Sequence, residues 1–143
     1  MKTEKIKIFL VDDDALFLKS LEIQFNQHAD FSLETYATGE ACLAAISNDP
    51  DIIILDYLLD GIEKNVMNGL ETLDKIKSIN PDIPVIILSA QDKISVAVDC
   101  MHHRAYDYVV KSETAFIRLQ KNISTIFKYK KMEKELKWYM ERM

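Results

Sequence analysis

The chain has 143 residues, of which 48% are hydrophobic and 29% are charged, and this composition suits one globular domain with a sizeable core. With only three glycines and three prolines, the sequence argues against a loop-rich all-β protein. No run approaches the roughly 20 apolar residues of a membrane span, and residues 1–5 lead directly into a strand pattern instead of a signal peptide. We therefore expect a cytoplasmic protein that does not enter a membrane.

Charge is divided unevenly along the chain, whose formal net charge is −5. Residues 117–143 hold eight lysines or arginines against three glutamates, a net of +5, so residues 1–116 carry −10. This contrast predicts a boundary between an acidic domain at residues 1–125 and a basic segment at residues 126–143. The basic segment is either a helical extension or a linker to an output domain that this chain lacks.

The first predicted strand, residues 6–11, runs straight into Asp12, Asp13 and Asp14. Three adjacent carboxylates repel one another, so they need compensation by a cation, a helix N-terminus or solvent. Asp14 can cap the next helix, predicted over about residues 15–28. Apolar residues near helical spacing support that helix: Leu16, Leu18, Leu21, Ile23 and Phe25. Capping leaves Asp12 and Asp13 unexplained, and a solvated acidic turn is the alternative for them.

The central strand of the prediction is the apolar run at residues 52–55, which ends on Asp56. An alternating edge strand at residues 31–36 and a helix that opens at Thr38 and stops at residues 48–50 precede it. Four bulky apolar residues in a row indicate a strand buried on both faces, as in a parallel sheet. Asp56 then lies at the carboxyl end of the strand, where ligands bind in open α/β sheets. Taken alone, it could also be a turn or helix-cap aspartate.

The connection that follows, residues 57–69, has about a dozen residues where 2 to 6 are usual, and loops of this length are often functional. Beyond it the sequence predicts two strands and two helices before the C-terminal helix, namely a helix at residues 70–79, a strand at 83–88, a helix at 92–103 and a strand at 106–110. Ser89 and Ala90 follow the fourth strand, and Lys111 follows the fifth. Ser112 can cap the last helix.

Five strands that alternate with helices predict an α/β fold with a doubly wound parallel sheet and right-handed crossovers. The strand ends then bring together five polar side chains at one edge: Asp12, Asp13, Asp56, Ser89 and Lys111. Clustered carboxylates bind a hard cation, and Mg²⁺ prefers a few carboxylates, a carbonyl and water. With the repulsion offset, one carboxylate can attack a phosphoryl group while the ammonium and the hydroxyl hold its oxygens.

These residues, in this order at these strand ends, resemble the receiver domain of two-component response regulators over about residues 5–125. The resemblance implies a flavodoxin-like sheet of order 2-1-3-4-5 with helices on both faces. It implies that Asp56 accepts the phosphoryl group and that Asp13 is a direct Mg²⁺ ligand. By the same resemblance, Asp12 supports the ion through water, and the backbone carbonyl of Leu58 completes the protein ligands.

The resemblance also assigns a switch and its partners. Ser89 matches the switch hydroxyl of the family, Ala90 the small residue that gives phosphate access, Tyr108 the switch aromatic and Lys111 the family's lysine. The implied function is a phosphorylation-driven switch, not an enzyme acting on other substrates, although it catalyses its own phosphotransfer and dephosphorylation. The implied partner is a histidine kinase or phosphotransfer protein that donates the phosphoryl group. Phosphorylation is then expected to change the face formed by the fourth helix, the fifth strand and the fifth helix. Nucleic acid would be contacted only through an output domain outside this chain.

Two other functions compete with this interpretation. A receiver-like interaction module would keep the fold without phosphorylation, but the intact acids, Ser89 and Lys111 argue against it. A Mg²⁺-dependent phosphatase would also use an aspartyl nucleophile, but the sequence shows neither an Asp-x-Asp after a strand nor a cap domain.

The sequence departs from the family pattern in three places. Asp60 stands where the family usually has proline, and the connection from there to Gly69 is longer by about five residues. Ser112 follows Lys111 where proline is common, so the usual cis peptide is not expected.

The last helix is predicted to continue past the domain, because no glycine or proline lies between Ser112 and Met143. Four apolar residues are expected to pack on the domain core: Phe116, Leu119, Ile123 and Ile126. Beyond them, a coiled-coil pattern with spacings of three and four follows: Tyr129, Met132, Leu136, Tyr139 and Met143. Lys128 and Glu133 flank this seam, where a parallel partner would pair them. We expect a homodimer, while the short seam leaves a plain amphipathic helix, a linker or a basic helix on a membrane or nucleic acid open.

Overall fold

The computed structural model of the chain describes residues 5–59 and 65–143, which form five strands and five α-helices. The strands are β1 (Ile6–Val11), β2 (Phe31–Tyr36), β3 (Ile52–Asp56), β4 (Val85–Ser89) and β5 (Asp107–Val110). The helices are α1 (Ala15–Asn26), α2 (Gly39–Ala44), the 3-10 helix η1 (Ile46–Asn48), α3 (Gly69–Ile79), α4 (Ile94–His102) and α5 (Ala115–Met140). Strands and helices alternate along the chain as the sequence predicts.

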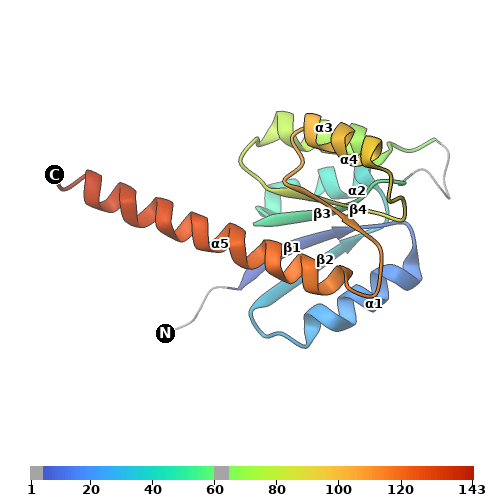
Figure 1. Cartoon of the computed structure of the whole chain (residues 1–143), viewed down its shortest axis with the longest axis horizontal. Coiled ribbons are helices and arrows are strands. Elements are labelled where there is room, and N and C mark those ends of the chain that lie inside the picture. Colours follow the sequence, from blue (N-terminus) through green and yellow to red (C-terminus); the bar gives the residue numbers. More distant parts are fainter. Residues whose placement is uncertain (1–4, 60–64) are drawn as a thin grey trace.

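The strands form one parallel sheet of order β2-β1-β3-β4-β5, and the predicted topology is confirmed. Its register aligns the strand ends, because Val11 pairs with Leu55, Asp56 with Leu88 and Ser89 with Val110. The residues that leave β1, β3, β4 and β5 therefore meet at one edge of the sheet (Figure 1).

Helices cover both faces of the sheet, with α1 and α5 on one side and α2, α3 and α4 on the other (Figure 1). The fully buried strand β3 contributes to both cores. Ile52 and Ile54 pack with α1 and α5, whereas Ile53 and Leu55 pack with α2, α3 and α4. This alternation explains why β3 is apolar at successive positions.

Helix α1 begins as predicted, but its apolar residues do not share one face. The Asp14 side chain accepts hydrogen bonds from the amides of Leu16 and Phe17 and so caps the helix. Leu21 and Phe25 are buried, but Leu16 is 85% and Ile23 53% exposed, so these two apolar residues do not pack on the core.

Helix α5 begins later than predicted. Ser112 does not cap it, because the first helical residue is Ala115 and the preceding Thr114 makes no side-chain cap. The Ser112 hydroxyl instead accepts a hydrogen bond from the amide of Thr114 within the connecting turn. The Lys111–Ser112 peptide is trans, because no cis peptide occurs in the described ranges. The departure at Asp60 lies outside the described residues.

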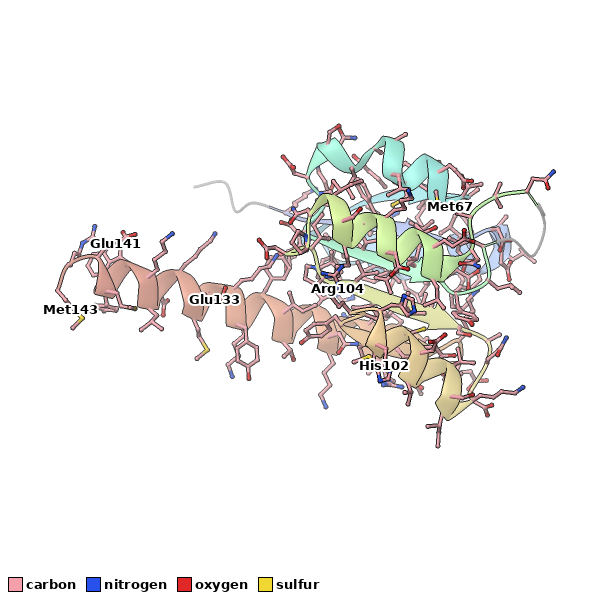
Figure 2. The ribbon with its side chains drawn as sticks, turned by 90° about the horizontal axis from the view of Figure 1, so that it is seen from above. Met67, His102, Arg104, Glu133, Glu141 and Met143 are labelled. Atoms are coloured by element: carbon pink, nitrogen blue, oxygen red, sulfur yellow. The ribbon has the colours of Figure 1, made fainter. Side chains whose placement is uncertain are left out.

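The C-terminal part of α5 stands clear of the domain (Figure 2). Leu119, Ile123 and Ile126 are buried in the core and Phe116 packs against it, as predicted. From residue 131 to the end of the chain every residue is exposed. Within residues 5–59 and 65–143, no helix combines the length and the apolar character that crossing a membrane requires.

Candidate functional site

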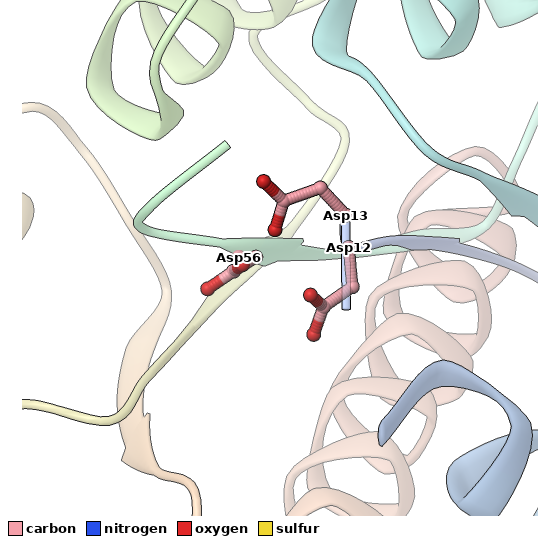
Figure 3. A group of neighbouring side chains, drawn as sticks. All are labelled: Asp12, Asp13 and Asp56. Atoms are coloured by element: carbon pink, nitrogen blue, oxygen red, sulfur yellow. The ribbon is translucent and has the colours of Figure 1, made fainter. Parts of the chain in front are cut away.

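Three carboxylates converge where β1 and β3 end (Figure 3). One oxygen from each of Asp12, Asp13 and Asp56 lies within 4.8 Å of the others, and Asp12 and Asp56 are buried. Asp12 also accepts a hydrogen bond from the amide of Asp14, which ties the acidic turn to the start of α1. The sequence prediction that these acids meet at one edge is therefore confirmed by the geometry.

Lys111 is the cation that faces this cluster among the described residues. Its Nζ lies 2.8 Å from Asp12 Oδ2 and 3.4 Å from Asp56 Oδ1. The Asp12 oxygen is buried and accepts no hydrogen bond from the described protein atoms, so the ion pair is what compensates its charge. Burial alone would lower the pKa of the Lys111 ammonium, but the two carboxylates outweigh burial and the pKa is raised.

One ammonium does not offset three carboxylates, and the pKa of Asp56 reflects this. Burial raises the pKa of the Asp56 carboxyl most, and the charge and hydrogen bond of Asp12 raise it further. Lys111 and the amide of Leu58 lower it in part, and the pKa is about 7. An additional cation at this position would be favoured, because it would relieve the remaining repulsion.

An open cleft of about 510 Å³ gives access to the carboxylates. Asp13, Asp56 and Lys111 line it together with Leu58, Ser89 and Ala90, so six of the site residues predicted from sequence meet here. The oxygens gathered around the cleft are the donors that a hard divalent cation prefers, and the uncompensated negative charge fits such an ion.

Ser89 and Tyr108 are linked through Gln91, which sequence reasoning missed. The amide of Gln91 donates to Ser89 Oγ over 3.0 Å, and the Tyr108 hydroxyl donates to the carbonyl of Gln91. The Tyr108 ring is 8% exposed, and burial raises the pKa of its hydroxyl. The predicted switch aromatic therefore lies inward, beside the strand end that carries Ser89 and outside the cleft lining.

The backbone that follows Asp56 is held against the start of α3. The amide of Gly69 donates to the carbonyl of Tyr57 over 3.1 Å, and a Cβ at Gly69 would lie 2.5 Å from the carbonyl oxygen of Asp56. Glu40 of α2 accepts a hydrogen bond from the amide of Met67 on the same connection. The described ends of the long loop are therefore anchored beside the site.

A family model for the response regulator receiver domain matches residues 8–124. The chain belongs to this family. Among curated proteins, this receiver domain is 34% identical over 118 residues to a protein-glutamate methylesterase/protein-glutamine glutaminase of Clostridium acetobutylicum. It is 32% identical over 105 residues to the C4-dicarboxylate transport transcriptional regulatory protein DctD of Rhizobium meliloti. These alignments cover 79% and 73% of the chain but only 32% and 22% of the two relatives.

Solved structures show the same fold. The receiver domain of NtrX from Brucella abortus matches with a TM-score of 0.71 and 28% identity, covering 82% of this chain and 98% of that one. A CheY in a CheX–CheY–BeF3–Mg complex from Borrelia burgdorferi matches with a TM-score of 0.75 and 25% identity, covering 87% and 90%. The receiver domain of a LuxO repressor protein from Vibrio parahaemolyticus, at 23% identity, covers 92% and 97% with a TM-score of 0.78.

Two residues of α1 also belong to the surroundings of the receiver site. Leu16 lines the cleft, and the Phe17 ring lies 4.6 Å from Lys111 Nζ, where it can stabilise the ammonium by a cation–π contact. Neither role carries a sequence signal, because an apolar residue in an amphipathic helix is first read as core.

Proposed function

We propose that this receiver domain is a signalling switch that accepts a phosphoryl group on Asp56. The observation that carries the proposal is the convergence of three carboxylates and Lys111 on one open cleft. Asp56 is the acid with raised pKa, it lies on the central strand, and its oxygen faces the ammonium. The alternative of an unphosphorylated interaction module leaves this costly grouping of acids without a use.

The proposed reaction is a phosphoryl transfer to the Asp56 carboxylate. A carboxylate oxygen attacks phosphorus, and the bond to the donor's leaving atom breaks with its electron pair. Lys111 Nζ and Ser89 Oγ donate hydrogen bonds to the transferred oxygens, and Ala90 leaves room for them. Dephosphorylation uses the same groups, with a water as the nucleophile that displaces the carboxylate. These steps make the domain a self-limited switch and not an enzyme on other substrates.

The donor set fits Mg²⁺, with Asp13, Asp56 and the Leu58 carbonyl as direct ligands and Asp12 acting through water. When bound, Mg²⁺ would supply positive charge that offsets the charge of the phosphoryl oxygens. The BeF3 and Mg named in the Borrelia burgdorferi CheY complex support this assignment. We propose a histidine kinase or phosphotransfer protein as the donor, and contact with nucleic acid only through a domain outside this chain.

The signal passes from Ser89 to Tyr108. Ser89 Oγ accepts a hydrogen bond from the amide of Gln91 and can donate its own proton to a phosphoryl oxygen, while the carbonyl of Gln91 holds the Tyr108 hydroxyl. Since Tyr108 is already inward here, phosphorylation has to stabilise this arrangement over one with the ring outside. The face formed by α4, β5 and α5 changes with it, and a second copy that associates through α5 would respond to that change.

The test is Mg²⁺-dependent labelling by a small acyl phosphate. We expect labelling of the parent chain, none of Asp56→Asn, and full labelling of Asp30→Asn, whose aspartate is exposed and outside the site. Undiminished labelling of Asp56→Asn would contradict the assignment of Asp56 as the phosphoryl acceptor. A parent chain that does not label would favour the interaction module, and turnover of external phosphate esters would favour a phosphatase.

A further inference from the structure

The exposed part of α5 carries an apolar stripe on one side. Each helical residue advances about 100° around the axis, so the stripe residues fall within an arc of about 100°. They are Tyr129, Met132, Leu136, Tyr139 and Met140, and each is at least half exposed. An exposed side that is apolar over this length is typical of a helix that packs on a partner.

The stripe does not face the receiver domain to which it belongs. By this periodicity the buried residues Leu119 and Ile123 of the same helix are rotated by about 110° and about 150° from the centre of the stripe. Upstream, the side that carries the stripe is polar. There Asn122 donates to Asp107 of β5 over 2.8 Å, and Arg118 lies 3.8 Å from the same carboxylate. The stripe is therefore a separate surface that points to the side on which β5 lies.

The distribution of charge favours a second protein helix over a lipid surface. Trp138 leaves the helix about 150° from the centre of the stripe. Its ring meets that of Tyr139 edge-on, with the centroids 5.0 Å apart, and the Arg142 guanidinium stacks on it at 3.8 Å. A helix that lies on a membrane would centre its tryptophan within the apolar stripe, not outside it. Glu133 and Glu135 border the stripe on its two sides, where anionic lipid headgroups would repel them.

The spacing within the stripe fixes a register. Tyr129 and Leu136 take the first core position of successive heptads, and Met132 and Tyr139 take the second. Met143, which the sequence pattern also placed in the seam, lies beyond the end of the helix at Met140. In a parallel pair in register, Lys128 of one copy then lies opposite Glu133 of the other, and this ion pair forms twice. An antiparallel pair loses both contacts.

We propose that two copies of this chain associate through the stripe as a parallel, in-register coiled coil. This deepens the association through α5 proposed above and rests on it. Because the stripe points to the β5 side, the two receiver domains face one another across the axis with their β5 edges. The partner of the stripe is thus a second copy, and its axis lies beside the face that the switch changes.

The orientation is tested with cysteines at Met132 and Tyr139, the two equivalent core positions. In a parallel pair, two copies of Met132→Cys form a disulfide with each other under a mild oxidant, and so do two copies of Tyr139→Cys. In an antiparallel pair centred near Leu136, only a mixture of the two variants cross-links. The natural thiols, Cys42 and Cys100, are both buried and reduced, so they do not interfere. Trp138→Cys, on the opposite side, is the matched control and should stay uncoupled.

The register is tested by exchanging the charges of the flanking pair. Lys128→Glu should weaken the dimer in sedimentation by about fivefold, and Lys128→Glu/Glu133→Lys should restore it. Leu136→Glu should give monomers that still label at Asp56. A monomeric parent chain, cross-links confined to the mixture, or equal cross-linking at Trp138 would each overturn the proposal. Failure of labelling with an intact dimer would instead contradict the phosphorylation function alone.

Discussion

Replacing Asp56 by asparagine should stabilise the metal-free domain at neutral and alkaline pH. The wild-type carboxyl is buried beside Asp12, and its pKa rises from 3.8 to about 7 on folding. A carboxyl with a raised pKa is destabilising when ionised, so the free energy of unfolding falls as pH rises from the unfolded pKa through the folded one. Asparagine keeps the shape of the side chain and removes this titration.

The size of the effect follows from the interval between the two pKa values. Between the two pKa values, Asp56 is ionised in the unfolded state but protonated in the folded state. Over this interval, each pH unit lowers the free energy of unfolding by about 1.36 kcal/mol. Between pH 5 and pH 8 the wild-type domain should therefore lose about 3 kcal/mol more of its unfolding free energy than Asp56→Asn. Below the unfolded pKa the two proteins should differ little from this cause.

The assay is urea unfolding in the presence of a chelator at several pH values, with Asp30→Asn as the control at an exposed aspartate. The control should follow the wild-type profile. Parallel profiles for wild type and Asp56→Asn would refute the reasoning, because they would mean that Asp56 titrates normally in the fold. Added Mg²⁺ should stabilise the wild type at pH 8 and have less effect on Asp56→Asn, which offers one carboxylate fewer.

Three further outcomes follow from single contacts. Gly69→Ala should lower the free energy of unfolding by about 1–3 kcal/mol in thermal melts, because its methyl would lie 2.6 Å from the Tyr57 carbonyl oxygen, a backbone atom that cannot rotate away. Ser89→Ala should still accept phosphate but change dimerisation less on phosphorylation, as sedimentation with and without phosphodonor would show. The hydrogen bond to Asp74 raises the pKa of His103, so wild type should exceed His103→Gln in stability below pH 6.5 and lose that advantage at higher pH, by less than about 1 kcal/mol for so exposed a pair.

The sheet and the site edge could be predicted from sequence because both follow from strong local signals. Apolar runs of strand length separated by amphipathic helices leave few alternatives to a doubly wound sheet. Because the strands are parallel, the residues that directly follow them lie at the same edge of the sheet. Asp12, Asp56 and Lys111 could thus be brought together without any knowledge of their contacts.

Other features depend on contacts that sequence patterns do not encode. Leu16 and Ile23 are seven residues apart and share an exposed face of α1. Counting apolar residues near helical spacing does not distinguish this face from the buried one. Gln91 joins Ser89 to Tyr108 through its backbone, and a backbone contact leaves no trace in residue type. The start of α5 was misplaced because Ser112 and Thr114 both suit a cap, and only the turn geometry decides between them.

Helix α5 connects the two ends of the molecule and should couple them. It starts four residues after Lys111 and runs without interruption to the stripe, so a shift of β5 is carried along a rigid element. If so, binding of BeF3 with Mg²⁺ at the acidic cleft should change the dimer dissociation constant by about fivefold or more. Because each dimer holds two sites, reciprocity then requires that Leu136→Glu change the affinity of each site for BeF3 by the square root of that factor, about twofold. A dimer constant unaffected by BeF3 would show that α5 holds two copies together without reporting on the site.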